Sequence, residues 1–158
     1  MSNNLSPTEA EQEPSTNEMR AFAYRLLGRR EYSRQELSNR ISRKWPQATD
    51  IQLLVDQLEE ENLVSDERFA ESFLRSRVQR HQGPMKIKAE LRGKGVPDAI
   101  ISGALESMSG GWKALAAEWL ERQHSGTIEF ADKQKYYRRL VNRGFTHNQA
   151  MDVLNRSV

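Results

Sequence analysis

A helical pattern that repeats along the chain is the feature that most constrains how this sequence can fold. Apolar residues recur at i, i+3, i+4 and i+7, as they do from Ile51 to Leu58, and they do not alternate as in strands. A shift of 49 positions aligns Gly95 with Gly144 and Leu91 with Leu140. Aligned glycines mark helix ends and are less generic than aligned leucines. The pattern predicts an all-α chain, an elongated array of three tandem three-helix repeats.

Signals for helix starts recur along the chain as well. In a capping box, the side chains of the first and fourth residues satisfy each other's backbone N–H groups. This pattern fits Ser33–Glu36, Thr49–Gln52 and Thr146–Gln149. Ser65 followed by two acids, and Pro84 after a glycine, are typical of first helical turns.

These signals divide the chain into four segments. Residues 18–64, 65–108 and 109–158 are predicted to be the three repeats. Residues 1–17 carry three Glu, no Lys or Arg, and many Ser, Thr and Asn, so we interpret them as a disordered acidic leader. Because such a leader contributes no core residue, we expect its deletion to change the free energy of unfolding by less than about 0.5 kcal/mol.

The charges are segregated along the chain, although the net charge is only +2. Eight Lys and Arg residues fall within residues 20–44 and seven within residues 75–94, each group with few acids. Residues 50–67 hold seven acids and no Lys or Arg before Arg68. Such segregation favours docking to a mixed partner, part phosphate and part protein.

Composition and spacing argue against several kinds of chemistry. The chain has no cysteine, so it can hold no disulfide, thiolate metal site or cysteine nucleophile. Its three histidines lack partners at metal-ligand spacing, and Gly93-Lys94-Gly95 lacks the Walker spacing. We therefore expect no metal, no cofactor and no enzyme activity. Without a run of about 18 apolar residues or a secretory signal, we expect a cytoplasmic protein that contacts no membrane.

The stretch from Leu63 to Val96 contains a more specific pattern. It reads Leu-Val-Ser-Asp-Glu-Arg-Phe-Ala, continues to Arg-Ser-Arg and Gly-Pro, and ends in a basic helix with Glu-Leu and Lys-Gly. This pattern closely resembles the signature of the RecX family of regulatory proteins. Residues 29–37 in the first repeat support the resemblance, and residues 112–116 and 136–145 in the third support it more loosely. The resemblance therefore covers the chain from about residue 18 to its end.

The resemblance implies a function that composition and spacing do not show. Members of this family modulate the RecA recombinase: they bind in the groove of the RecA–DNA filament, inhibit ATP hydrolysis and strand exchange, and restrain recombination and the DNA-damage (SOS) response. It implies the RecA filament as partner, with single- and double-stranded DNA bound weakly and without strong sequence preference. We expect a monomer.

Basic side chains on the predicted helices are the candidates for contact with the filament or its DNA. Lys88 and Arg92 stand one turn apart, away from the apolar stripe, and their equivalents in the third repeat are Tyr137 and Val141. The helical scaffold therefore does not require their charge. The full set of candidates is Arg29, Arg30, Arg34, Arg75, Arg77, Arg80, Lys86, Lys88, Arg92, Lys94, Arg138 and Arg139.

Two positions depart from the family pattern. The first repeat has Trp45-Pro46 and three extra residues where the other repeats have Gly95 and Gly144, so its turn between the second and third helices should differ. The third repeat has Ala131-Asp132 in place of the Gly-Pro pair, so the start of its second helix has the weakest signal.

Two other classes of function remain open. Residues 33–64 resemble half of a winged helix, and a helix-turn-helix DNA-binding transcription regulator should continue into a β-hairpin. Instead, the signal at Ser65 predicts another helix. Such a regulator would bind a specific duplex sequence tightly. A helical adaptor without nucleic-acid contact would bind its partner with little dependence on salt.

Overall fold

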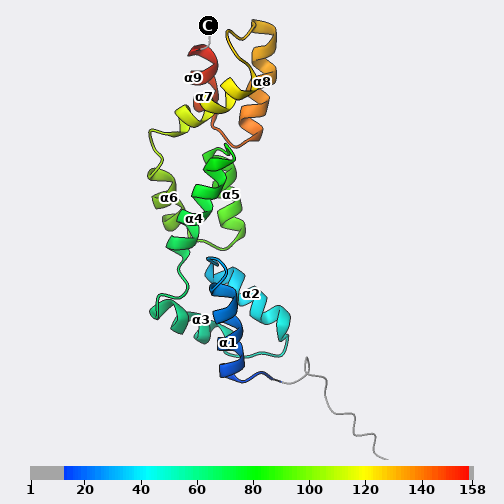
Figure 1. The fold of residues 1–158 in the computed structure, drawn as a ribbon, viewed down its shortest axis with the longest axis vertical. Coiled ribbons are helices and arrows are strands. Elements are labelled where there is room, and N and C mark those ends of the chain that lie inside the picture. Colours follow the sequence, from blue (N-terminus) through cyan, green and yellow to red (C-terminus); the bar gives the residue numbers. More distant parts are fainter. Residues whose placement is uncertain (1–12, 157–158) are drawn as a thin grey trace, which may run out of the picture. The chain divides into compact units, whose positions relative to one another are not determined.

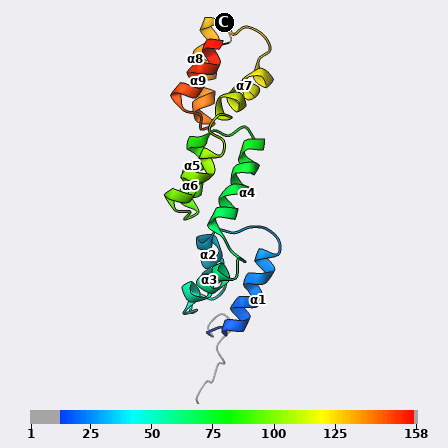
Figure 2. The ribbon, with the colours of Figure 1, turned by 90° about the vertical axis from the view of Figure 1, so that its left-hand side faces the viewer.

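The computed structural model describes residues 13–156 of the chain. Within this range the chain forms nine helices and no strand (Figures 1 and 2). The helices are α1 (Thr16–Leu27), α2 (Arg34–Lys44), α3 (Ile51–Glu60), α4 (Asp66–Gln79), α5 (Pro84–Gly93), α6 (Asp98–Glu106), α7 (Trp112–Gln123), α8 (Phe130–Asn142) and α9 (His147–Arg156). Three helices fall in each predicted repeat. The prediction of an all-α fold of three-helix repeats is confirmed.

The helices belong to two compact units, which we describe separately. Unit 1 contains the described residues up to Phe69 together with Lys94–Val96, and unit 2 contains Ala70–Gly93 and the residues from Pro97 onward. The division between the units falls inside α4 and beside the turn between α5 and α6. The repeat boundaries given above stay a prediction.

Apolar side chains from neighbouring helices hold each unit together. In unit 1, α2 packs against α1 and α3, and Leu37, Ile41 and Val55 are fully buried. In unit 2, α9 packs against α7 and α8, and Leu140 and Ala150 are fully buried. Burial of one Leu or Ile side chain contributes about 1.5–3 kcal/mol, so these contacts dominate the stability of each unit.

Two of the three predicted capping boxes are confirmed. The N–H of Glu36 donates to the Ser33 hydroxyl at 3.0 Å, and the N–H of Ser33 donates to the Glu36 carboxylate at 3.3 Å. The N–H of Gln149 donates to the Thr146 hydroxyl at 3.1 Å, and the N–H of Thr146 donates to the Gln149 side chain at 2.9 Å. Both boxes therefore fix a helix start from local sequence alone.

The third predicted capping box, Thr49–Gln52, is wrong. The residue before α3 is Asp50, which has a φ of 58° in the left-handed region and makes no cap hydrogen bond with its side chain. The hydroxyl of Thr49 donates instead to the carboxylate of Glu13. Thr49 therefore contacts Glu13, which is distant in the sequence, in place of the predicted contact with Gln52. A four-residue pattern cannot reveal such a distant contact.

The other start and stop signals agree with the structure. α4 begins at Asp66 and α5 begins at Pro84. Gly95 and Gly144 have φ values of 78° and 101°, which glycine adopts without a Cβ penalty. Because α4 follows residue 65 directly, no β-hairpin of the winged-helix kind follows residue 64 in the described chain.

The first helix begins earlier than predicted. α1 starts at Thr16, and the N–H of Glu18 donates to the Ser15 hydroxyl at 3.2 Å while the N–H of Ser15 donates back at 2.8 Å. The end of the segment predicted as a leader is therefore a helix cap and the start of α1. Deletion of residues 1–17 would remove this cap, so the expected near-zero effect does not apply. Residues 1–12 lie outside the described residues.

We expect the Ser15→Ala variant to lose about 1 kcal/mol of unfolding free energy, because the N–H of Glu18 loses its acceptor. Chemical denaturation followed by circular dichroism measures this loss. Ser125→Ala, in the exposed loop after α7, is a matched control that should stay within about 0.5 kcal/mol of the parent. Equal stability of Ser15→Ala and the parent would show that the cap contributes nothing.

In unit 2, the turn between α8 and α9 packs against the turn between α4 and α5. The N–H of Gly83 donates to the carbonyl of Arg143 at 2.7 Å, and the N–H of Met85 donates to the carbonyl of Gly144 at 2.8 Å. A Cβ added at Gly83 would lie 2.3 Å from the carbonyl carbon of Gly144. We call this arrangement, formed by residues 80–86 and 143–145, the turn contact of unit 2.

Unit 1 contains a corresponding contact. The hydroxyl of Ser33 donates to the carbonyl of Lys94 at 2.7 Å, and Lys94 aligns with Arg143 in the repeat pattern. A Cβ added at Gly95 would lie 1.8 Å from Oε1 of Gln35. A Cβ added at Gly144 in unit 2 would lie 2.5 Å from Cβ of Lys86, so close approach as well as positive φ explains both Gly95 and Gly144. We call residues 33–36 and 94–96 the turn contact of unit 1.

The two departures from the family pattern have local explanations. The turn between α2 and α3 spans residues 45–50, and the ring of Trp45 packs edge-on against Phe22 with centroids 5.4 Å apart. A packed indole takes the place of a glycine turn, so this turn differs as predicted. α8 begins at Phe130, and Glu129 before it makes no cap hydrogen bond with its side chain, in line with the weak start signal.

Candidate nucleic-acid interface

The structure divides the twelve candidate basic residues into two groups. One group forms ion pairs with carboxylates inside the described chain, so part of its charge is already balanced. These residues are Arg30, Arg34, Arg77, Arg92 and Lys94. The sequence alone does not show which candidate cations form ion pairs, because the carboxylates that pair with them lie on other turns or helices.

In unit 1, Arg34 joins the start of α2 to α3. Its guanidinium contacts Glu59 at 2.8 Å and also pairs with Asp56. Hydrogen bonds to Asp56 and Glu59 raise the pKa of Arg34. Its backbone N–H donates to the buried carboxylate of Asp66 at 3.0 Å, which ties α2 to the start of α4. Arg34 is therefore engaged in holding unit 1 together.

Glu36 occupies the centre of the turn contact of unit 1. It accepts hydrogen bonds from Lys94 at 2.9 Å and from Arg30 at 3.2 Å, and its side chain is only 15% exposed. Burial acts to raise the pKa of Glu36. The hydrogen bonds from Lys94, the Ser33 backbone and Arg30 outweigh burial, so its pKa is lowered. Two candidate cations thus bind one structural carboxylate.

We expect Glu36→Gln to lose about 1.5 kcal/mol of unfolding free energy at pH 7, because charge-assisted hydrogen bonds become neutral ones. The folded-state pKa of Glu36 lies below its unfolded value, so its contribution is present above the unfolded pKa and is lost as pH falls through the folded pKa. The variant should therefore lose less stability than the parent on acidification. Denaturation at several pH values measures this, with exposed Glu106→Gln as the control. Parallel pH profiles for Glu36→Gln and the parent would contradict the assignment.

In unit 2, Arg77 and Arg92 are paired as well. Arg77 contacts Glu90 at 3.1 Å and lies 4.3 Å above the ring of Phe73. Arg92 contacts Asp98 at 2.8 Å, and this hydrogen bond lowers the pKa of Asp98. Lys88, which the sequence grouped with Arg92, forms no ion pair in the described chain. The two residues are therefore not equivalent.

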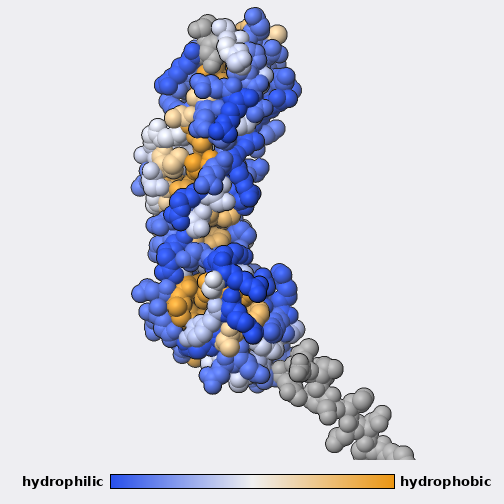
Figure 3. Space-filling model, viewed as in Figure 1, coloured by the Kyte–Doolittle hydropathy of each residue, from blue (hydrophilic) through white to orange (hydrophobic). Residues whose placement is uncertain are grey.

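The second group of candidates forms no ion pair within residues 13–156. These residues are Arg29, Arg75, Arg80, Lys86, Lys88, Arg138 and Arg139. All are exposed except Lys88, which is half-buried. Figure 3 shows that hydrophilic residues cover most of the visible face of α8, which carries two of these cations. This group is the part of the candidate site that is free to bind an anion.

The turn contact of unit 2 contains two members of this group, Arg80 and Lys86. Arg80 follows α4 and Lys86 lies in the first turn of α5, whereas Arg139 lies on α8, one turn before Arg143. The guanidinium of Arg143 donates to the carbonyls of Arg80 and, at 3.0 Å, His81. Residues separated by more than 50 positions in the sequence thus meet at one junction.

Two residues that the structure makes prominent, Arg143 and Phe130, are not among the candidates predicted from the sequence. Arg143 lies 5.4 Å from the ring of Trp119 and caps the end of α4, and burial lowers its pKa. Its alignment with Lys94 was a signal for this role. Phe130 is 88% exposed at the start of α8. Its position outside the Tyr136/Leu140 stripe could have indicated its exposure.

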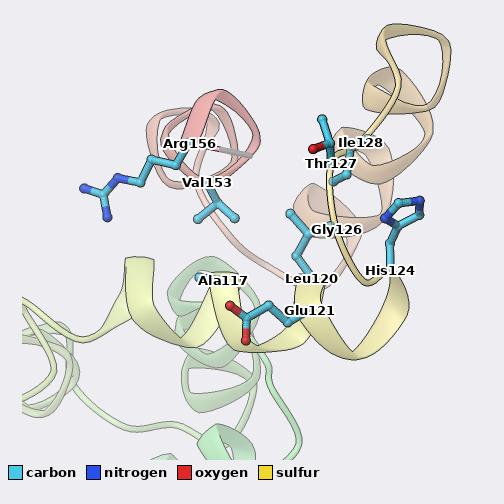
Figure 4. Close-up of a pocket in the computed structure, with 9 residues that line it drawn as sticks. All are labelled: Ala117, Leu120, Glu121, His124, Gly126, Thr127, Ile128, Val153 and Arg156. Atoms are coloured by element: carbon cyan, nitrogen blue, oxygen red, sulfur yellow. The ribbon is translucent and has the colours of Figure 1, made fainter. Parts of the chain in front are cut away.

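A pocket in unit 2 lies between α7, α9 and the loop that follows α7 (Figure 4). Its polar lining includes Glu121, His124 and Arg156. Figure 4 shows the imidazole of His124 and the guanidinium of Arg156 on different sides of the pocket, so these groups do not converge on one point. This arrangement offers no nucleophile with an adjacent base.

Residues 13–156 contain neither a cluster of metal-ligating side chains nor a helix that could span a membrane. No group of three His, Cys, Asp or Glu side chains in that range is placed to hold a metal ion. None of the helices described there is long and apolar enough to cross a membrane.

The fold and the basic surface define a class: an all-helical repeat protein that presents unpaired cations at the junction of two repeats. Comparison with known proteins is more specific. A sequence model of the second three-helix domain of RecX matches residues 65–105. The chain is 45% identical over 133 residues to the regulatory protein RecX of Chromohalobacter salexigens, covering 84% of this chain and 88% of that protein. It is 40% identical over 134 residues to the regulatory protein RecX of Halorhodospira halophila, covering 83% of each.

The chain belongs to the RecX family of regulatory proteins. Solved structures agree in fold: RecX from Lactobacillus salivarius superposes with a TM-score of 0.77 at 21% identity, covering 89% of this chain and 95% of that one. A second structure of regulatory protein RecX gives a TM-score of 0.75 at 19% identity, covering 89% and 73%.

Proposed function

We propose that this protein is a regulator of the RecA recombinase and has no catalytic activity of its own. It acts in the cytosol, binds in the groove of the RecA–DNA filament and inhibits ATP hydrolysis and strand exchange by RecA. In this way it restrains recombination and the SOS response. Membership of the RecX family supports RecA as the partner.

One structural observation carries the proposal. Arg80 and Lys86 both lie in the turn contact of unit 2, and neither forms an ion pair with a carboxylate within residues 13–156. Cations that the fold does not neutralise are available to contact phosphates. Backbone hydrogen bonds from Gly83 and Met85 hold the turn that carries both residues, so their backbone positions are set before the partner binds, which lowers the cost of binding.

The experiment measures inhibition of RecA's DNA-dependent ATP hydrolysis by the parent and by an Arg80→Glu/Lys86→Glu variant over a range of salt. We expect the variant to need at least about tenfold more protein for the same inhibition. The slope of log apparent affinity against log salt concentration should be shallower for the variant, by about 0.9 for each duplex phosphate that it no longer binds. Both residues are exposed, so folding should be unaffected.

A matched control carries the same change of charge elsewhere in the chain. Arg40 and Arg43 lie on α2, are exposed, form no ion pair within residues 13–156 and are outside the candidate set, so Arg40→Glu/Arg43→Glu should inhibit as the parent does. If the two double variants behave alike, only net charge matters and the junction is not the site. Inhibition that barely depends on salt in the parent would favour the helical adaptor. Tight binding to one duplex sequence would favour the transcription regulator.

A further inference from the structure

A groove between α8 and α9 in unit 2 is distinct from the basic junction. It has a volume of about 470 Å³, and its lining includes Phe130, Lys133, Gln134, Tyr137, Met151 and Asn155. Both ribbon views show α8 and α9 side by side (Figures 1 and 2). The fold does not explain the most exposed side chain of this lining, Phe130.

Aromatic rings form one wall of this groove. Phe130 and Tyr137 lie seven residues apart on α8, which places them two turns apart on one helix face. Phe130 is 88% exposed, so its ring contributes almost nothing to the core. The hydroxyl of Tyr137 is 2.7 Å from Nδ1 of His147, and the two rings meet edge-on with centroids 5.6 Å apart. The Tyr137 ring is therefore held in place.

The polar part of the lining consists of a cation and two amides, Lys133, Gln134 and Asn155. The lining includes no carboxylate. Asp152, on the same helix as Asn155, is paired with Lys113 at 3.5 Å and with Arg156 at 3.1 Å. Arg138 follows one residue after Tyr137 and is exposed without an ion pair in the described chain. Glu129 and Asp132 lie close to Phe130 in the sequence but outside the lining, whose one charged side chain is Lys133, so the lining itself favours an anionic occupant.

We propose that this groove binds unpaired nucleotides of single-stranded nucleic acid by stacking bases on Phe130 and Tyr137. Every base has a flat π-face, so aromatic platforms bind single strands with little sequence preference. Lys133 and Arg138 contact the phosphates, and the amides of Gln134 and Asn155 can hydrogen-bond to base edges. A duplex hides its base faces and would not fit. This inference rests on the proposed function, because the single strand that the groove would bind is the DNA strand of the RecA filament.

The test uses the full chain without RecA and a labelled single strand of about 12 nucleotides, a length within the usual site size. We expect Phe130→Ala to weaken binding about 5- to 50-fold, the loss expected for one stacked base. The slope of log affinity against log salt should not change, because every cation that binds a phosphate is still present. Lys133→Ala should lower that slope by about 0.7. Phe130→Trp should bind as well as the parent.

Two nucleic-acid controls isolate stacking. A strand of the same length without bases should bind the parent and Phe130→Ala equally, and so should the matched duplex. Leu53→Ala removes another exposed apolar side chain, in unit 1, and should not change single-strand binding. Circular dichroism should show unchanged folding for Phe130→Ala, since its ring is not in the core.

Several results would overturn the inference. The parent could fail to bind single strands at low salt, or Phe130→Ala could bind them as the parent does. An equal loss on the strand without bases would rule out stacking. If Phe130→Ala weakened only filament binding, the groove would receive a protein segment instead. None of these results bears on the proposed function. If the proposed function were wrong, the parent would fail to inhibit RecA.

Discussion

Replacing Gly83 by alanine is expected to remove about 3 kcal/mol of unfolding free energy, because the new Cβ has no space. It would lie 2.3 Å from both the carbonyl carbon of Gly144 and the backbone nitrogen of Phe145. These are backbone atoms, so no side chain can rotate to relieve the overlap. Gly83 does not have a positive φ, and the loss would therefore come from close approach rather than from backbone strain.

The matched control is Gly103→Ala in α6. An added Cβ at Gly103 meets no atom within 4 Å, so alanine should stabilise the helix by up to about 1 kcal/mol. Chemical denaturation compares the two variants. Hydrogen exchange at the amides of Gly83 and Met85, which donate across the turn contact of unit 2, should become faster in Gly83→Ala. If both glycine variants matched the parent in stability, the turn contact would not hold unit 2 together.

Gly83→Ala also probes the proposed function without altering any charge. The substitution leaves Arg80 and Lys86 in the sequence but disturbs the turn contact of unit 2, in which both lie. We expect weaker inhibition of RecA at temperatures where the variant is still folded. Unchanged inhibition would show that the cations act independently of their arrangement.

Replacing Arg143 by alanine is the second change with a large expected effect, a loss of about 3 kcal/mol. Its guanidinium donates to the carbonyls of Arg80 and His81, just beyond the end of α4, and lies 5.4 Å from the ring of Trp119. Removing it leaves carbonyls at a half-buried junction without donors, and it also removes a cation–π contact.

Arg143→Lys separates charge from geometry. Lysine keeps the positive charge and can contact Trp119, but it lacks the planar fork that reaches two carbonyls at once. We expect it to recover about half of the stability lost in Arg143→Ala, as measured by thermal or chemical denaturation. Full recovery would mean that charge alone matters, and a variant Arg143→Ala as stable as the parent would contradict the capping role.

The candidate site was only partly predictable from the sequence. The basic clusters were visible, but ion pairs such as Arg34 with Glu59 depend on how α2 packs against α3. Lys88 and Arg92 look equivalent by helical spacing, yet Arg92 forms a direct ion pair with Asp98, whereas Lys88 acts on Asp98 only at longer range and forms no ion pair in the described chain. Spacing fixes which side chains share a face of one helix, and it does not fix which acids another element brings near them.

The sequence by itself determined the all-α fold, the repeat pattern and most of the helix starts. These follow from interactions within four residues, such as the Ser33–Glu36 capping box, so local sequence contains all the atoms involved. It also determined where glycine is needed, through the alignment of Gly95 with Gly144. Only the tertiary structure decided why: each glycine turn packs against the first turn of another helix of its unit, at Gln35 of α2 in one case and at Lys86 of α5 in the other. Which cations remain free was likewise decided by packing, because Coulomb and hydrogen-bond energies depend on distances between segments that the linear order does not specify.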